Sequence, residues 1–104
     1  MQAARVDKPK LEELTFNTES EREIYLEKLS KKYPAGITHE VYKEEKATVN
    51  RFVIVRNNQA NEFREVKYYW GGADYTLNGK PITAQYFLQQ TKPRDNDYYN
   101  KKEM

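Results

Sequence analysis

The residues of this chain that could do chemistry are few, and their spacing does not assemble a catalytic group. The chain has no cysteine, its only histidine is His39, and its only serines are Ser20 and Ser30. Nucleophilic catalysis requires a nucleophile beside a base. Both serines lie in a segment with a helical pattern, whereas His39 lies on a predicted strand, so a Ser–His pair would have to form between separate elements. We expect no catalytic residues.

Metal, phosphate and glycosidase sites are not indicated either. One histidine and no cysteine leave only carboxylates as metal ligands, and the acidic groups Glu44-Glu45 and Asp95-Asn96-Asp97 lack the spacing and glycine of a calcium loop. Gly71-Gly72 lacks the glycine pattern of a phosphate-binding loop. A glycosidase pair needs two acids facing across a cleft, which domains of this size seldom contain. We expect no metal and no cofactor, and predict that the protein is not an enzyme.

Aromatic residues are the most promising binding groups. They make up 13% of the chain, and several fall together in residues 67–75. Because consecutive strand residues point to opposite faces, Tyr69 lies on the opposite face from Tyr68 and Trp70. Two short helices can cover only one face, so we expect an exposed ring and predict partner binding by Tyr69, Trp70 and Tyr75. The alternative is that Trp70 fills the core against the first helix while Tyr69 covers the other face.

A helix is predicted over about residues 19–33. Thr18-Glu19-Ser20-Glu21 has the form of a capping box, in which the threonine oxygen accepts from the amide three residues on. Pro34 and Gly36 end the helix. The apolar side chains at helical spacing form one stripe that should face the core: Tyr25, Leu26, Leu29 and Tyr33.

Strand patterns begin after this helix. Residues 37–42 alternate like a half-buried strand, and residues 48–56 are rich in β-branched residues, as expected of a central strand. Asn57-Asn58 tolerates the left-handed conformation that a tight hairpin requires, and a further strand follows over about residues 61–70. Gly71-Gly72 breaks the ladder, as a bulge or tight turn would.

A short strand, a hairpin and a short helix complete the pattern. Residues 73–77 resume as a strand, and Asn78-Gly79 is the strongest hairpin signal in the chain. Pro81 restricts the return segment to an edge strand or a connector, and Thr83 can cap a helix over residues 84–91. The sequence therefore predicts an α+β fold with an N-terminal helix, an antiparallel β-meander of three to five strands and a short C-terminal helix.

The expected organisation is one domain with two extensions. Residues 1–17 form an extended N-terminal arm, residues 18–92 a single α+β domain, and residues 93–104 a flexible polar tail with little apolar area to bury. No apolar run approaches the roughly 20 residues that cross a bilayer, so we expect no membrane span. The net charge of +2 lacks the strongly basic face of a nucleic-acid-binding protein.

A group of short segments adds a family resemblance. These are Arg51–Arg56, Glu62–Val66, Trp70-Gly71-Gly72, Tyr75, Asn78-Gly79, Ile82-Thr83 and Thr91. Over about residues 20–91 the set resembles small uncharacterised domains of exported proteins from Bacteroidetes-type bacteria. The resemblance implies a periplasmic or secreted location, places Gln2 close to the mature N-terminus, and carries no catalytic residues. Because no signal peptide follows Met1, a cytoplasmic location stays open.

These patterns predict a non-enzymatic binding or accessory module. Its leading function is protein–protein interaction, as a small subunit of a larger bacterial envelope assembly. The alternative is binding of carbohydrate or single-stranded nucleic acid by exposed tyrosine and tryptophan. The exposure of Tyr69 and Trp70 distinguishes these two functions. Exposed coplanar rings favour a stacking ligand, whereas buried rings leave only a surface for a protein partner.

Overall fold

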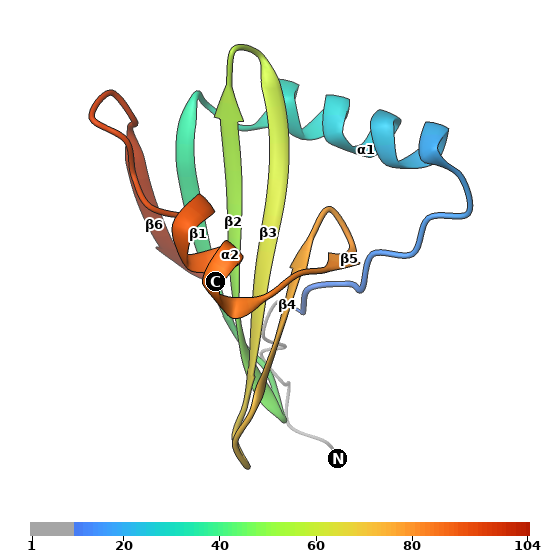
Figure 1. Ribbon diagram of the computed structural model, residues 1–104, viewed down its shortest axis with the longest axis vertical. Helices are drawn as coiled ribbons and strands as arrows, with labels where there is room; N and C mark the ends of the chain where they lie inside the picture. The colour runs from blue at the N-terminus through green and yellow to red at the C-terminus, as the bar shows by residue number, and fades with distance from the viewer. Residues whose placement is uncertain (1–9) are drawn as a thin grey trace, which may run out of the picture.

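Two helices lie on opposite faces of a curved six-stranded sheet (Figure 1). The computed structural model describes residues 10–104, so residues 1–9 of the expected arm, including Gln2, lie outside the described residues. The strand order is β5-β4-β3-β2-β1-β6. The elements are α1 (Glu19–Lys32), β1 (Gly36–Lys43), β2 (Ala47–Arg56), β3 (Gln59–Tyr68), β4 (Ala73–Leu77), β5 (Lys80–Pro81), α2 (Ala84–Gln90) and β6 (Tyr99–Glu103).

Strands β1 to β5 form an antiparallel meander, which confirms the α+β class and the predicted order of elements as far as α2. The hairpin turns also have the expected conformation, since Asn57, Asn58, Asn78 and Gly79 all adopt positive φ. The sheet is mixed rather than wholly antiparallel, because β6 adds a sixth strand that pairs in parallel with β1.

Helix α1 forms where the capping box predicted it. The Thr18 hydroxyl accepts a hydrogen bond from the Glu21 amide at 3.2 Å, and the helix ends at Lys32, with Tyr33 as its cap. Leu29 is buried against Val53 and Val55 of β2, with Tyr25, Leu26 and Tyr33 packed around it. The predicted apolar stripe is therefore the contact surface of the helix.

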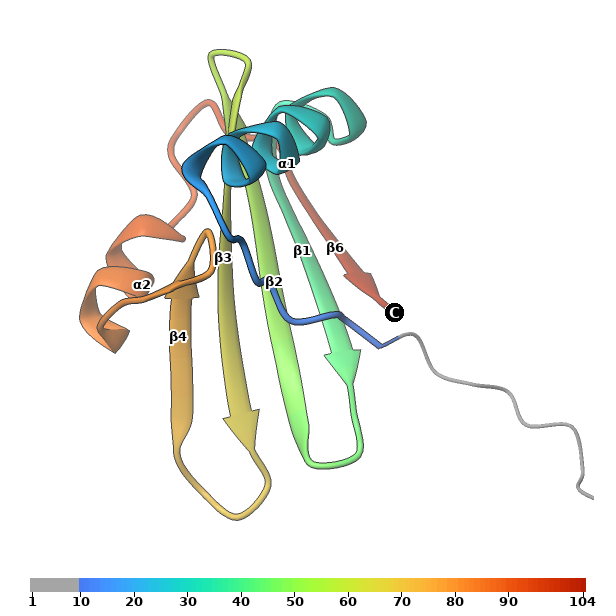
Figure 2. The same ribbon diagram turned by 90° about the vertical axis from the view of Figure 1, so that its right-hand side faces the viewer.

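The two faces of the sheet differ in what covers them. Side chains alternate along β2, so that Arg51 and Val53 point to the face under α1, here called the α1 face, and Phe52 and Ile54 point to the other, the α2 face. Helix α1 crosses only the upper part of its face, and α2 lies against the other face (Figure 2). The lower halves of the strands, which end in the β1–β2 and β3–β4 turns, extend beyond both helices.

The expected flexible polar tail is wrong for residues 99–103, because these residues form β6. Backbone hydrogen bonds place this strand: the Ile37 amide donates to the Tyr98 carbonyl at 2.7 Å, and the Met104 amide donates to the Val41 carbonyl at 2.8 Å. The side chains of β6 are largely exposed, so no apolar periodicity marks the strand in the sequence. The domain therefore continues past residue 92.

Candidate binding groove

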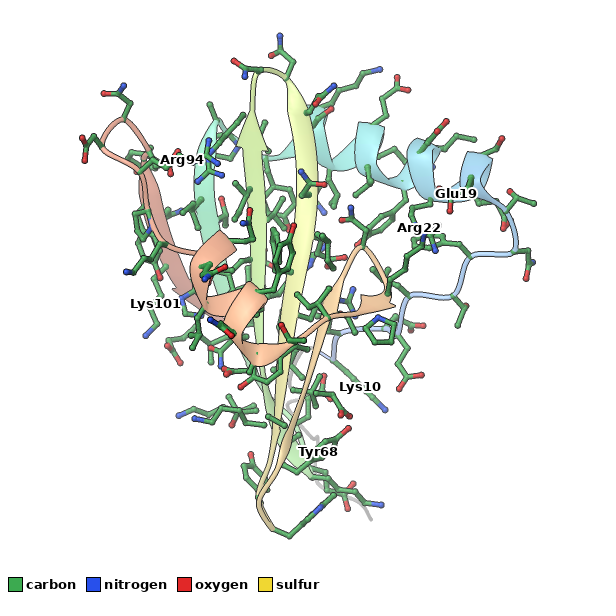
Figure 3. All side chains as sticks on the ribbon, viewed as in Figure 1. Lys10, Glu19, Arg22, Tyr68, Arg94 and Lys101 are labelled. Atoms are coloured by element: carbon green, nitrogen blue, oxygen red, sulfur yellow. The ribbon has the colours of Figure 1, made fainter. Side chains whose placement is uncertain are left out.

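A groove of about 770 Å³ lies on the α1 face, below the helix. Its floor is formed by Ala47, Val49 and Val66 of β2 and β3, and Tyr68 lies at its lower end (Figure 3). The volume falls within the roughly 300–1,000 Å³ of known ligand sites. Because the floor is apolar and the rim is charged, the groove suits a ligand that has both apolar and polar groups.

One wall of the groove is the N-terminal segment, residues 10–16. This segment runs below α1 across the front of the sheet (Figure 2). The Leu11 amide donates to Glu44 Oε2 at 3.1 Å, and Arg64 Nη1 donates to the Glu12 carbonyl at 2.6 Å. Phe16 packs against Tyr25 with 5.4 Å between ring centroids. The part of the expected arm that the structure describes is thus an extended segment bound along the sheet.

Charges of both signs surround the groove in nearly equal number. Arg64 is buried at the inner side, and the lining carries ammonium and carboxylate groups from Lys10, Glu13, Lys43, Glu44, Glu45 and Lys46. A groove with this balance has no strong attraction for a highly charged polymer such as nucleic acid.

The β3–β4 turn, which follows Tyr68 at the lower end of the groove, carries two large exposed rings. Tyr69 is 61% exposed and Trp70 is 70% exposed. The Trp70 ring stacks on Tyr68 at a centroid distance of 4.9 Å and an interplanar angle of 21°, and Tyr68 Oη donates to Asp74 Oδ2 at 2.8 Å. The expectation of an exposed ring is confirmed, and the alternative in which Trp70 fills the core is wrong.

Tyr69 is also held in place, by the neighbouring hairpin. Its hydroxyl donates to the Glu44 carbonyl at 2.9 Å, and its amide donates to the Lys46 carbonyl at 3.1 Å. These two bonds join the β3–β4 turn to the β1–β2 turn. Both exposed rings are therefore positioned by contacts of their own.

Tyr75 lies apart from this pair. It points to the α2 face, half-buried, with its ring 5.0 Å from Phe87 between centroids. Partial burial, together with a hydrogen bond to Glu65, raises the pKa of its hydroxyl. The structure thus exposes Tyr69 and Trp70 in the β3–β4 turn and places Tyr75, the third predicted binding residue, in the packing beneath α2.

Under α1 the structure also holds a buried network of charged residues that the sequence patterns did not predict. Arg51 bonds to Glu40 Oε1 at 2.8 Å and to Glu62, which Arg64 also contacts at 3.0 Å. Burial by itself would raise the pKa of Glu40, but hydrogen bonds from Arg51, Tyr33 and Tyr42 hold it below its ordinary value. The detectable signal was the presence of charged residues at inward positions near the middle of β1, β2 and β3, namely Glu40, Arg51, Glu62 and Arg64.

The imidazole of His39 is held in place by packing and hydrogen bonds within the sheet. Its ring stacks on Phe52 at 4.1 Å between centroids, Nε2 lies 2.8 Å from Asn50 Oδ1, and Nδ1 lies 2.7 Å from the Tyr99 hydroxyl. Asn50 Nδ2 donates to Glu65 Oε1 at 3.0 Å, which orients the amide oxygen toward the imidazole. Both ring nitrogens of His39 are therefore engaged within the sheet.

The chain was compared with protein-family models, curated proteins and solved structures, and none of them matches it. Within residues 10–104, no helix is long and apolar enough to cross a membrane, and no group of three acidic or histidine side chains is placed to hold a metal ion. The groove and the two exposed rings therefore define the candidate functional site by their geometry.

Proposed function

We propose that this protein is a non-enzymatic binding module that contacts a protein partner through the groove and the exposed rings of Tyr69 and Trp70. The observation that carries the proposal is that both rings are largely exposed yet individually fixed in position. Large aromatic side chains in the centre of an interface supply much of its binding energy. A ring that is already ordered loses less conformational entropy when a partner binds it.

The N-terminal segment indicates which kind of partner suits the groove. Residues 10–14 are a polypeptide that lies extended on this face, and Glu44 and Arg64 bind its backbone amide and carbonyl groups. The vacant part of the groove runs beside this segment and carries the same mixture of apolar floor and charged rim. An extended segment of a protein partner, with one large apolar side chain against Trp70, fits these features.

Carbohydrate binding is the second candidate, and one observation favours it. The near-parallel stack of Tyr68 and Trp70 presents an exposed indole at the end of a groove that carries carboxylates. Sugar rings stack on such platforms, and the exposure of these rings is the feature expected of a stacking ligand. A protein partner ranks first because the same face already binds an extended polypeptide, residues 10–14, through Glu44 and Arg64. The balanced charge of the lining argues against single-stranded nucleic acid, whose backbone is tracked by a positively charged groove.

Site-specific crosslinking in the native host tests the protein-binding proposal. A photo-crosslinking amino acid at position 69 or 70 should capture one defined protein, whereas the same group at Tyr98, which is 63% exposed near the opposite end of the sheet, should not. Equal products from both ends would refute the proposal. Binding to a glycan array that Trp70→Ala abolishes, without a protein crosslink, would establish the carbohydrate function instead.

Once a partner is captured, the affinity of Trp70→Ala provides the quantitative test. Loss of a central aromatic anchor should weaken binding by about 2 kcal/mol, or about thirtyfold. The melting temperature should stay at the wild-type value, because the ring is exposed. Unchanged affinity in folded Trp70→Ala and Tyr69→Ala would remove this end of the sheet from the interface.

We propose further that the partner belongs to a bacterial envelope assembly, in which this protein is a small accessory subunit. The support is the resemblance of residues 20–91 to domains of exported proteins. Fractionation of the native host tests this: the protein should accompany periplasmic or secreted markers, and recovery with cytoplasmic markers would refute an envelope role.

A further inference from the structure

Strand β6 differs from the other long strands in how little its side chains contribute to the core. Tyr99 and residues 101–103 are exposed, and Asn100 is half-buried. Strand β1 beside it is buried over Gly36–Tyr42, so β6 covers a complete strand edge with its backbone. The attachment of β6 therefore depends mainly on the backbone ladder and on a few specific contacts.

Three contacts make the β1 edge selective for the segment that occupies it. Arg56 forms two hydrogen bonds with the Asp97 carboxylate, at 2.6 and 3.1 Å, and His39 Nδ1 lies 2.7 Å from the Tyr99 hydroxyl. Between them, Gly36 leaves room for the Tyr98 backbone, since a Cβ at Gly36 would lie 2.3 Å from the Tyr98 carbonyl oxygen. Together these contacts recognise an extended Asp-x-Tyr segment.

We propose that the outer edge of β1, with Arg56 and His39, is a strand-acceptor site, and that two copies of this chain associate by exchanging residues 97–103. The second copy fits because its own residues 97–103 can make all three contacts. Such an exchange reproduces every interaction of β6 and leaves both helices and their clusters in place.

The connection to β6 permits the exchange. Residues 92–96 are all exposed, so this linker can open without removing a side chain from the core. Within one chain the tethered strand acts at a millimolar effective concentration, which favours the closed monomer in dilute solution. Exchange between copies therefore requires a high local concentration of the protein, or a linker too short for β6 to reach β1 of its own chain.

Shortening the linker tests this directly. We expect the full chain to be monomeric at about 10 μM and the variant lacking residues 93–96 to be a dimer in size-exclusion chromatography with light scattering. Amide protons of residues 99–103 should remain protected from exchange in that dimer, because β6 is docked on the second copy. A folded monomer with unprotected residues 99–103 would overturn the proposal.

A peptide experiment decides the matter if the shortened chain does not fold. The full-length Asp97→Asn variant keeps the acceptor residues while its own strand is weakened, so a labelled peptide of residues 94–104 should bind it. The same peptide carrying Asp97→Asn should bind about tenfold or more weakly, since a charge-assisted contact is lost. Adding Arg56→Met to the chain should abolish that difference. Equal binding of both peptides to the Asp97→Asn chain, or no binding up to 1 mM, would refute the acceptor site.

Discussion

The α1 face and the α2 face are built from the same strands but are stabilised by different interactions. On the α1 face Glu40, Arg51, Glu62 and Arg64 are all buried in one hydrogen-bonded network. On the α2 face the equivalent layer is apolar: Ile37, Ile54 and Phe63 pack on Phe87, with Phe52, Tyr75, Leu77 and Ile82 around them. The difference follows from the alternation of side chains along each strand.

Helices α1 and α2 are attached to the sheet by different kinds of contact. Helix α2 is seven residues long, and its one buried residue, Phe87, is an apolar anchor. Helix α1 adds polar contacts, because Tyr25 donates to Glu62 and Tyr33 donates to Glu40 from above the network. Directional contacts of this kind fix the position of α1 on the sheet, whereas apolar packing alone tolerates small shifts.

The largest effect is expected on removal of the central cation of the α1 face. Arg51→Met leaves Glu40 and Glu62 buried without their main partner, which should reduce the free energy of unfolding by about 3–5 kcal/mol at pH 7. Denaturant titrations measure this loss, and the exposed Arg94→Met is the matched control. A loss below about 1 kcal/mol would show that the network is dispensable.

The pH dependence of this loss identifies its electrostatic origin. In the wild type the Glu40 pKa is lowered, so its contribution to stability is present above the unfolded-state value near 4 and disappears as pH falls through the folded value. Arg51→Met has already lost this contribution. The difference between the two proteins should therefore shrink below about pH 4.

A comparable loss, but with a different dependence on pH, is expected on the α2 face. Phe87→Ala removes the ring that contacts Phe52, Phe63 and Tyr75, and should cost about 3–5 kcal/mol through lost packing and cavity formation. Because these contacts carry no charge, the loss should be the same at pH 7 and pH 4. Leu88→Ala, at an exposed position of the same helix, is the control.

Smaller losses of stability are expected when a single tyrosine hydroxyl is removed, and they should differ between the two faces. Tyr33→Phe removes a donor to Glu40 and an acceptor from Arg51, so we expect a loss of about 1–2 kcal/mol. Tyr99→Phe removes one contact with His39 at a more exposed position and should cost about 0.5 kcal/mol. Thermal melts of both variants give the comparison, and equal losses would contradict the distinction between the faces.

The sequence predicted those parts of the fold that local signals specify. The capping box at Thr18 begins α1, and Asn78-Gly79 forms a turn with positive φ at both residues. Strand β6 could not be predicted, because its residues are polar and its place depends on the distant edge of β1. The buried network was missed for a related reason: Glu40, Arg51 and Arg64 become neighbours only through the register of three strands.

The candidate site, too, could be predicted from the sequence only in part. The alternation of residues and the shortage of covering helices predicted an exposed ring among Tyr69, Trp70 and Tyr75; Tyr69 and Trp70 are exposed and Tyr75 is half-buried. The groove beside them could not be predicted, since its wall is the extended segment 10–16, whose course depends on contacts with Glu44 and Arg64. Tyr75 is close to Tyr69 and Trp70 in sequence, but it lies past the turn on β4, where its ring packs on Phe87.

The last prediction concerns the Arg56–Asp97 contact that holds β6, and its dependence on pH distinguishes this contact from the buried network of the α1 face. The Arg56 side chain lowers the pKa of Asp97 to about 2, below the unfolded-state value near 4. The Arg56–Asp97 contact therefore contributes stability above about pH 4, and that contribution is lost as pH falls toward 2. Asp97→Asn should lower the melting temperature at pH 7 and not at pH 2, with the exposed Asp95→Asn as control. Because Asp97→Asn leaves Glu40 untouched, the acid sensitivity that persists in this variant should include the contribution of Glu40 on the α1 face. If Asp97→Asn removed all of the acid sensitivity, the dominant titrating group would lie at β6 and the buried network would contribute little.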